Sequence, residues 1–447
     1  MTNPLTSSPF PVPKSAYLHI PFCRRRCYYC DFAVFVVGDR RHGENFDLIQ
    51  HYVDVLCQEI VQSVATATHD ILPLDTVFFG GGTPSLISVR QLHQILATLD
   101  QHLGIGAGAE ISIEMDPGTF DQEKLAGFAQ GGINRVSLGV QAFQDELLAL
   151  CGRSHNVREI YTALDMVHQV GVKNFSIDLI SGLPRQTPDH WQESLEKALA
   201  LAPTHLSHYD LIVEPVTAFG RFYQPGKTPL PSDWATAQMY RLAQATFTQA
   251  GYQHYEISNY ARPGYSCRHN LVYWHRQPYY GFGMGAASYQ GGYRFTRPRK
   301  SQLYFEWVAN GPSQQGTQRN QPNGAEWVDS PQESLLETLM LGLRLSDGLN
   351  LMDLAKNFGE KTVEMVLNGL EPYLQKGWVE FSEIESEIES ESQAGIENNK
   401  ENDKTVLITT AKRPGFSGRI CLTDPEGFLF SNTVLASLFD QFSNFVG

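Results

Sequence analysis

The sequence of 447 residues predicts an α/β fold, in which a partial (β/α)6 barrel is followed by a winged-helix-like α+β domain. Two observations lead to this prediction. In the first half of the chain, short apolar segments alternate with longer amphipathic segments. Near the end of the chain, helical patterns precede two short strand patterns.

Six βα units run from about residue 15 to residue 220. The expected strands are Ala16–Ile20, Asp75–Phe79, Glu110–Met115, Arg135–Gly139, Asn174–Leu179 and Leu206–Ile212. The expected helices are Phe46–Ala65, Val89–Leu103, a segment from Asp121, Asp145–Leu150, Val157–Val170 and Trp191–Leu201. In such folds ligands gather at the carboxyl ends of the strands, where several reactive side chains of this chain stand.

The alternation stops after residue 220. Residues 221–325 are rich in glycine and aromatic residues, and we expect them to extend the barrel. Residues 326–447 form the expected C-terminal domain, with helices at Leu335–Leu343, Leu349–Phe358, Val363–Lys376 and Asn432–Phe442 and a hairpin of Trp378–Phe381 with Arg419–Leu422. Residues 1–14 and the acidic insert 382–404 are expected to be disordered.

Charge and hydropathy exclude several classes of protein. The net charge is −14, and Ser382–Lys404 alone holds eight carboxylates against two lysines. Without a clustered basic face, nucleic-acid binding is not expected. No segment has the ~20 apolar residues of a transmembrane helix, and residues 1–13 do not have the pattern of a signal peptide, so a cytoplasmic protein is expected.

Three of the seven cysteines are clustered as Cys23-x-x-x-Cys27-x-x-Cys30, directly after a predicted strand. Three thiolates on one loop can ligate three irons of a [4Fe–4S] cluster and leave the fourth iron open to a small molecule. The alternative is a structural zinc site, which requires a fourth ligand such as His19 or Cys267.

Further motifs follow the cysteine loop in a recognisable order. The motifs are Tyr17–Cys23, Gly80–Pro84, Glu114–Gly118, Gly139–Phe143, Gly152–His155 and Asp178–Pro184. Over about residues 15–215 the chain resembles the HemN/HemW family of radical SAM proteins. The resemblance implies a [4Fe–4S] cluster on Cys23, Cys27 and Cys30, S-adenosylmethionine (SAM) on the open iron, and a reductant such as flavodoxin or ferredoxin.

The resemblance also implies a set of SAM contacts: Tyr17, Gly81, Gly82, Thr83, Glu114, Gln141, Arg153, Asp178 and Ile212. The glycines allow the backbone to approach the methionine amine, and Glu114 could accept from that amine or from the ribose. Arg153 is a plausible partner of the methionine carboxylate. Gln141 and Asp178 could bind ribose hydroxyls, although a structural hydrogen bond would otherwise be the simpler interpretation of each.

The family has two branches, the HemW branch, whose members act as heme chaperones, and the coproporphyrinogen III dehydrogenase branch. In three features the chain is more similar to the HemW branch. Phe32 stands where the dehydrogenase has a further cysteine, and only 22 residues precede Cys23. His269-Asn-Leu-Val-Tyr273-Trp274 matches the His-Asn-x-x-Tyr-Trp motif of the HemW branch.

The motif predicts a heme site, with His269 as axial ligand and Tyr273 and Trp274 as stacking surface. His275 and Cys267 are the fallback ligands, and a capped turn with buried aromatic residues is the structural alternative. We therefore expect a heme chaperone that delivers heme to client hemoproteins, in which SAM and the cluster modulate dimerisation or transfer. The alternative is an oxygen-independent coproporphyrinogen III dehydrogenase, so whether the chain is an enzyme stays open. A DNA-binding role of the C-terminal wing has little support given the acidic charge.

Overall fold

The structure is a computed structural model that describes residues 11–38, 47–65, 67, 70–311, 330–383 and 418–443. It divides into two compact units, one ending at Ser330 and one beginning at Pro331. The predicted disorder of residues 1–14 and of the insert 382–404 falls for the most part on residues outside these ranges.

The first unit is built on one nine-stranded sheet with the strand order β11-β1-β4-β5-β6-β7-β8-β10-β9. Its strands are β1 (Ser15–Ile20), β4 (Leu74–Gly81), β5 (Ile105–Met115), β6 (Arg135–Gln141), β7 (Asn174–Ser181), β8 (His205–Asp210), β9 (Gln253–Glu256), β10 (Asn259–Ala261) and β11 (Tyr280–Phe282). The pairs from β11 to β8 are all parallel, and β10 runs antiparallel to both of its neighbours, β8 and β9. All six predicted strands are therefore present, in sequence order.

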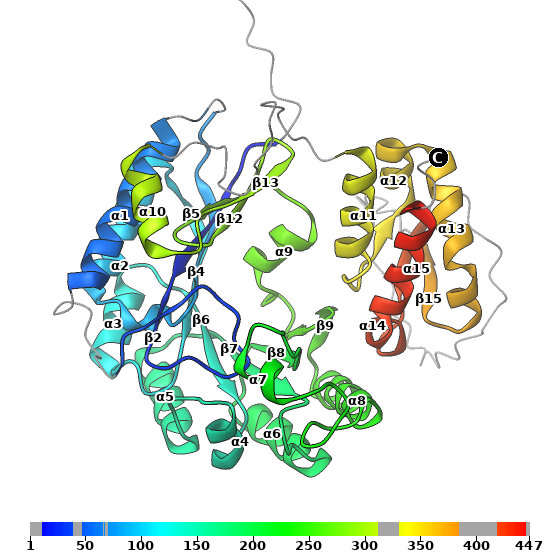
Figure 1. The fold of residues 1–447 in the computed structure, drawn as a ribbon, viewed down its shortest axis with the longest axis horizontal. Helices are drawn as coiled ribbons and strands as arrows, with labels where there is room; N and C mark the ends of the chain where they lie inside the picture. Colours follow the sequence, from blue (N-terminus) through cyan, green and yellow to red (C-terminus); the bar gives the residue numbers. More distant parts are fainter. Residues whose placement is uncertain are drawn as a thin grey trace, which may run out of the picture. The chain divides into compact units, whose positions relative to one another are not determined.

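Helices connect the parallel strands and surround the sheet in Figure 1. They are α1 (Asp47–Ala65), α2 (Val89–His102), α3 (Gln122–Gln130), α4 (Asp145–Leu150), α5 (Val157–Val170), α6 (Pro188–Ala200), α7 (Ala218–Phe222) and α8 (Asp233–Gln249). Several begin where the sequence offers a cap. Ser88, Asn156 and Thr187 each form a capping box with the third helical residue, which satisfies two free backbone N–H groups.

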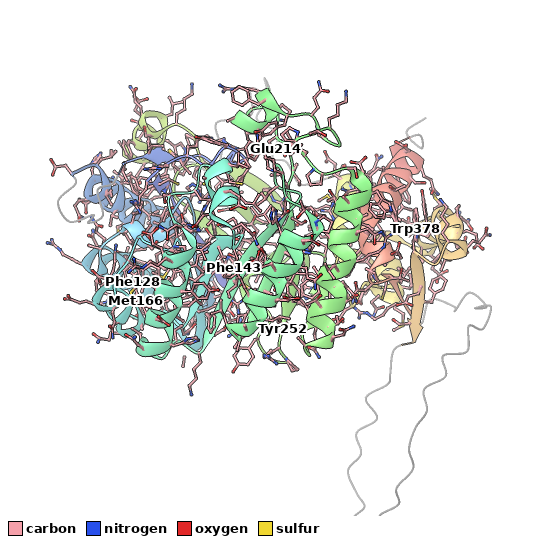
Figure 2. All side chains as sticks on the ribbon, turned by 90° about the horizontal axis from the view of Figure 1, so that it is seen from below. Phe128, Phe143, Met166, Glu214, Tyr252 and Trp378 are labelled. Atoms are coloured by element: carbon pink, nitrogen blue, oxygen red, sulfur yellow. The ribbon has the colours of Figure 1, made fainter. Side chains whose placement is uncertain are left out.

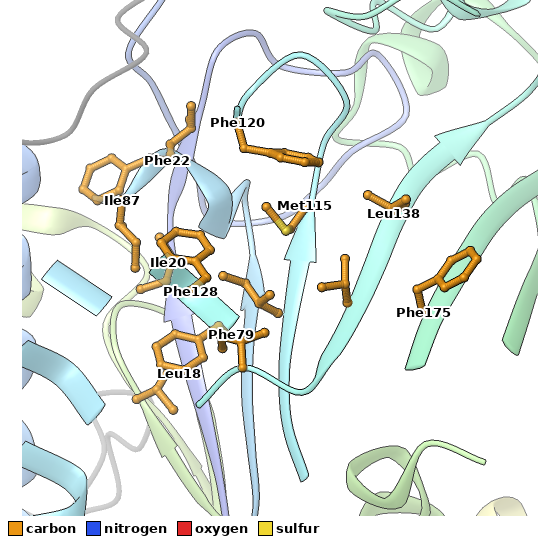
Figure 3. Packing of buried hydrophobic residues seen from close by; sticks show 14 of the residues in the cluster. Leu18, Ile20, Phe22, Phe79, Ile87, Met115, Phe120, Phe128, Leu138 and Phe175 are labelled. Carbon is orange, nitrogen blue, oxygen red and sulfur yellow. The ribbon is translucent and has the colours of Figure 1, made fainter. Parts of the chain in front are cut away.

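The two faces of the sheet carry different side chains, because alternate residues of a strand point to opposite sides. One face is apolar and packs under the helices, as Figure 3 shows for residues including Ile20, Phe79 and Met115 against Phe128. The other face carries polar side chains, which the register places next to one another across strands. Glu114 lies opposite Ser137, and Asp178 lies opposite Ser207.

The glycine-rich segment after residue 220 supplies the strands at both edges of the sheet. It supplies β10 and β9 beside β8, and β11 beside β1. It also forms α9 (Arg268–Trp274), the hairpin of β12 (Ala287–Gln290) and β13 (Tyr293–Thr296), and α10 (Ser301–Ala309).

A buried carboxylate ties this late segment to the first helix. Glu59 of α1 is fully buried and accepts from Arg297 Nε at 2.8 Å, from the Tyr304 hydroxyl at 2.7 Å and from the Gly283 N–H at 2.8 Å. Each Glu59 oxygen is therefore satisfied by groups from the region that carries β11 and α10.

The second unit has the predicted α+β composition. Its elements are α11 (Pro331–Gly342), β14 (Leu349–Asn350), α12 (Leu351–Phe358), α13 (Glu360–Gln375), β15 (Val379–Glu383), β16 (Gly418–Leu422), α14 (Glu426–Leu429) and α15 (Ser431–Ser443). The predicted hairpin is present, since β15 pairs antiparallel with β16. Trp378, labelled in Figure 2, stacks on Phe430 with ring centroids 4.3 Å apart and joins the hairpin to α14.

Most predicted boundaries shift by a few residues, and two of the shifts change the description of the fold. Leu349 and Asn350 are not helical but pair with β16, because the Asn350 side chain caps α12 by accepting from the Met352 and Asp353 N–H groups. The strand expected to reach Ile212 ends at Asp210, which places Ile212 beyond the sheet.

We predict that Glu59→Ala lowers the free energy of unfolding of the first unit by about 3–5 kcal/mol, because Arg297 would then be buried without its counter-charge. Urea unfolding of the two proteins measures the difference. Glu306→Ala, on the exposed side of α10, is the control and should change it by less than about 0.5 kcal/mol. Equal losses in the two variants would contradict the assigned role of Glu59.

Candidate functional site

The three clustered cysteines lie on a loop between two short parallel strands, β2 (Phe22–Cys23) and β3 (Phe35–Val36). The Cys30 N–H donates to the Cys27 carbonyl at 3.2 Å, and the Tyr28 N–H donates to the Cys151 carbonyl at 3.0 Å. All three thiols are half-buried and lie near enough to interact electrostatically. The loop is therefore folded back on itself and held to the end of α4.

Polar groups from three strand ends surround this loop. Arg153 pairs with Asp116, donates to the Gly139 carbonyl at 2.9 Å and donates from Nη1 to Cys27 Sγ at 3.4 Å. The Thr83 hydroxyl donates to Asp116 Oδ2 at 3.0 Å and lies 3.8 Å from Cys23 Sγ. Asp116 is thus connected to Cys27 through Arg153 and to Cys23 through Thr83. The sequence did not single out Asp116 as a site residue, although it belongs to the Glu114–Gly118 motif.

Burial changes the pKa of the Cys23 and Cys30 thiols. It raises the pKa of Cys23 to about 12, with a further contribution from the Asp116 carboxylate, and it raises the pKa of Cys30. These thiols hold their protons at neutral pH until iron displaces them, so binding of a metal cluster releases protons.

The donor set fits the [4Fe–4S] cluster that the family implies, because each of three thiolates can bond a different iron of a cubane. No three His, Cys, Asp or Glu side chains in the described ranges form a group that could hold one metal ion. A structural zinc site would need His19 or Cys267 as fourth ligand. His19 Nε2 bonds the Ala33 carbonyl at 3.0 Å, and Cys267 Sγ lies 3.7 Å from Glu110 Oε1, so both side chains are engaged elsewhere.

A cavity of about 240 Å³ lies over the polar face of the sheet. Four of the nine predicted SAM contacts line it, namely Tyr17, Gly81, Glu114 and Asp178. Phe32, whose side chain is 54% exposed, and Tyr273 of α9 also line it. The cavity therefore joins the cysteine loop, the strand ends and the His-Asn-x-x-Tyr-Trp motif.

Glu114 and Gly81 meet inside the cavity, where the Gly81 N–H donates to Glu114 Oε2 at 3.0 Å. Gly81 has a φ of +111°, and a Cβ there would lie 2.5 Å from the His19 ring, so only glycine fits the turn. Burial raises the pKa of Glu114 to about 8, which outweighs the opposing effect of the Gly81 hydrogen bond. A cationic amine in the cavity would favour the ionised carboxylate.

Three serines hold the Asp178 carboxylate. Ser207, Ser137 and Ser176 donate to it at 2.6, 2.8 and 2.9 Å. Burial nevertheless raises the pKa of Asp178. Ser176 is on β7 with Asp178, whereas Ser137 and Ser207 come from β6 and β8, so no local sequence pattern could identify those two.

Among the buried side-chain atoms for which the described residues offer no hydrogen-bond partner, two belong to predicted SAM contacts. They are Gln141 Oε1 and Arg153 Nε. Gln141 also has a φ of +64°, a strained conformation for a residue other than glycine. An acceptor and a donor left open at the strand ends fit a ligand that carries hydroxyls and a carboxylate.

Three more predicted SAM contacts, Gly82, Tyr17 and Ile212, have different surroundings. The Gly82 N–H donates to the Ile20 carbonyl at 2.9 Å, and the Tyr17 hydroxyl bonds His19 Nδ1 at 3.0 Å. Ile212 lies beyond the end of β8 with 70% of its side chain exposed, and it does not line the cavity.

The predicted heme ligand, His269, is fully buried in α9 against β4. Its Nδ1 bonds the Thr76 hydroxyl at 2.7 Å, its Nε2 bonds the Tyr273 hydroxyl at 2.8 Å, and its ring stacks on Phe78. Burial lowers the pKa of His269 to about 3, so the ring is neutral. Heme ligation by this histidine would require Nδ1 or Nε2 to give up its hydrogen bond.

Comparison with known proteins identifies the fold. The chain matches the radical SAM superfamily over residues 17–198 and the HemN C-terminal domain over residues 329–383. Among solved structures, the radical SAM enzyme coproporphyrinogen III oxidase (HemN) from Escherichia coli superposes with a TM-score of 0.72 at 23% identity, covering 97% of this chain and 91% of that one. The chain therefore has the radical SAM fold, whose family implies a [4Fe–4S] cluster and SAM.

Similar proteins narrow the radical SAM class to one family. The protein named heme chaperone HemW from Synechocystis sp. is 46% identical over 429 residues, which is 96% of this chain and 97% of the relative. The protein of the same name from Bacillus subtilis is 34% identical over 83% of this chain and 93% of its own length. The chain belongs to the HemW family. No helix in the described part of it has both the length and the apolar character that crossing a bilayer requires.

We predict that changing Cys23, Cys27 or Cys30 to Ser removes most of the iron from anaerobically reconstituted protein, because each thiolate holds a separate iron. Cys57→Ser is the matched control, since Cys57 lies in α1 away from the loop. Iron content and the visible absorption spectrum report the result. An intact four-iron spectrum in Cys27→Ser would show that the ligand assignment is wrong.

We predict that Glu114→Gln removes a pH dependence of stability. Between the ordinary pKa of 4.5 and about 8, the folded protein holds a proton that the unfolded chain has lost. The free energy of unfolding of the parent therefore falls over this range as pH rises, relative to the Gln variant. Urea unfolding of both proteins without cofactors, at pH 5, 6.5 and 8, tests this, and parallel curves would contradict the raised pKa.

Proposed function

We propose that this chain is a cytoplasmic heme chaperone that binds heme and transfers it to client hemoproteins. The observation that carries the proposal is similarity over nearly the full length of both proteins to a relative named heme chaperone HemW, at 46% identity. Both sequence domains of the family are present in this chain.

The lining of the cavity supports a role other than porphyrin oxidation. Four of the predicted SAM contacts line it. Phe32 also presents an exposed aromatic ring to this cavity, where the sequence comparison with the dehydrogenase branch expects a thiol.

In this proposal the residues of the site bind the cofactors, and the bound cofactors control heme transfer. When bound, a reduced [4Fe–4S] cluster supplies one electron to SAM. Arg153, Thr83 and Asp116 hold the cysteine loop, while Glu114, Gln141 and Asp178 orient SAM. We infer that these cofactors modulate dimerisation or heme transfer, with a flavodoxin or ferredoxin as reductant. His269, Tyr273 and Trp274 stay the sequence-based prediction for heme contact.

A paired assay tests the proposal. Addition of hemin to the purified protein should produce a Soret band at one equivalent, because a bound porphyrin is held away from water. Coproporphyrinogen III, under anaerobic and reducing conditions with SAM, should not be converted to protoporphyrinogen. Robust conversion, or the absence of any heme binding, would refute the chaperone assignment.

A further inference from the structure

The cavity over the polar face of the sheet reaches deeper than Glu114. Ser112 stands two residues before Glu114 on β5, and Arg135 stands two residues before Ser137 on β6. Two residues of a strand span about 6.6 Å, and their side chains share one face of the sheet. Ser112 and Arg135 are neighbours in the register, both line the cavity, and neither is a predicted SAM contact. We name this end of the cavity, with Asn270 and Tyr273 of α9, the inner pocket.

Arg135 is a buried cation with one edge of its guanidinium free. The residue is 2% exposed, and its Nη1 donates to Asn174 Oδ1 and to the Tyr265 carbonyl, both at 3.0 Å. Nε and Nη2, on the other edge, donate to no group in the described part of the chain, and no carboxylate there forms an ion pair with Arg135. A charge that has left water is costly unless it is paired. A free guanidinium edge matches the two oxygens of a carboxylate.

Ser112 adds a second open donor beside this edge. The residue is 2% exposed, and the described residues offer its buried Oγ no hydrogen-bond partner. A buried hydroxyl without a partner costs free energy, and such a group calls for a ligand or water. Because a hydroxyl rotates freely, Ser112 can donate to an anion that its neighbour Arg135 holds.

The other walls of the inner pocket are compatible with an anion that has an apolar part. Phe78 and Tyr273 contribute aromatic rings, and Asn270 contributes a side-chain amide. Burial raises the pKa of Glu114 to about 8, so at neutral pH this carboxyl group is mostly protonated and repels an anion little. Asp178 is already bonded to three serines and forms no ion pair with Arg135.

We propose that the inner pocket binds a small organic carboxylate. The Nε–Nη2 edge of Arg135 and the Ser112 hydroxyl hold its two oxygens, and its apolar part packs against Phe78 and Tyr273. The ligand is small because the same cavity contains four predicted SAM contacts. This binding site goes beyond the proposed function and does not depend on heme.

The charge of the pocket favours a carboxylate over a phosphate. One guanidinium balances the single charge of a carboxylate, whereas a phosphate group carries about −1.5 to −2 at neutral pH. The nearby Asp178 carboxylate would oppose the additional charge, since it is close enough to interact with Arg135. Aromatic walls also suit a hydrocarbon tail, which inorganic phosphate does not have.

Butyrate titration of the full-length, cluster-reconstituted protein tests the proposal, with butyramide as the neutral molecule of the same shape. Saturation-transfer NMR of the ligand measures both affinities, with and without SAM. Butyrate should bind saturably and at least about tenfold more tightly than butyramide, because only the carboxylate pairs with Arg135. SAM should leave butyrate bound, since the predicted SAM contacts Gly81, Glu114 and Asp178 lie nearer the strand ends.

Two variants place the ligand. Ser112→Ala should weaken butyrate binding by at least about fivefold through loss of one charge-assisted hydrogen bond. Its urea unfolding should match that of the parent, because the hydroxyl bonds no group of the described chain. Arg135→Lys keeps the charge but loses the two-pronged edge, so it should weaken binding as well. Ser194→Ala is the matched control, since Ser194 is fully buried in α6 and does not line the cavity.

Several results would overturn the proposal. Absence of butyrate binding, equal binding of butyramide, or parent-like affinity in both Ser112→Ala and Arg135→Lys would each do so. Displacement of butyrate by SAM would make the inner pocket a part of the SAM site. Tighter binding of inorganic phosphate than of butyrate would contradict the class of ligand. Failure of the parent protein to bind heme would refute the proposed function and leave this binding site unaffected.

Discussion

The pleat of the central sheet is the constraint on which the site depends. Since alternate side chains point to opposite faces, each parallel strand carries an apolar set under the helices and a polar set on the inner face. Polar groups that leave water must bond one another or a ligand. The three serines that hold Asp178 meet this requirement internally, while Gln141 and Arg153 meet it only in part.

Arg153 also affects the electrostatics around the cysteine loop. It is nearly buried, with 7% of its side chain exposed, and it faces both the Asp116 carboxylate and Cys27. A cluster held by three thiolates brings negative charge into this region, and a buried guanidinium offsets it. Hydrogen bonds to cluster sulfurs and burial of the cluster both tune its reduction potential. The same side chain would therefore connect the fold of the loop with the reduction potential of a cluster bound there.

The sequence predicted the elements well, because strand alternation, helix caps and cysteine spacing are local properties. All six inner strands and the C-terminal hairpin are where the pattern placed them. What local pattern could not provide was contact between distant residues. His269 is bonded to Thr76, 193 positions earlier, and nothing near His269 in the sequence indicates its burial. The same holds for Ser137 and Ser207, which reach Asp178 from the two neighbouring strands.

The pairing of β1 with β11 has a consequence for synthesis of the chain. Residues 16–18 belong to the first strand in the described part of the chain, but their outer partner is residues 280–282. Until that late segment has been translated, β1 is an open sheet edge that can pair with other nascent chains. Contacts between such distant positions also form slowly. The outer side of β1 therefore stays unpaired until residues 280–282 have been made. During this interval the growing chain most needs protection from aggregation.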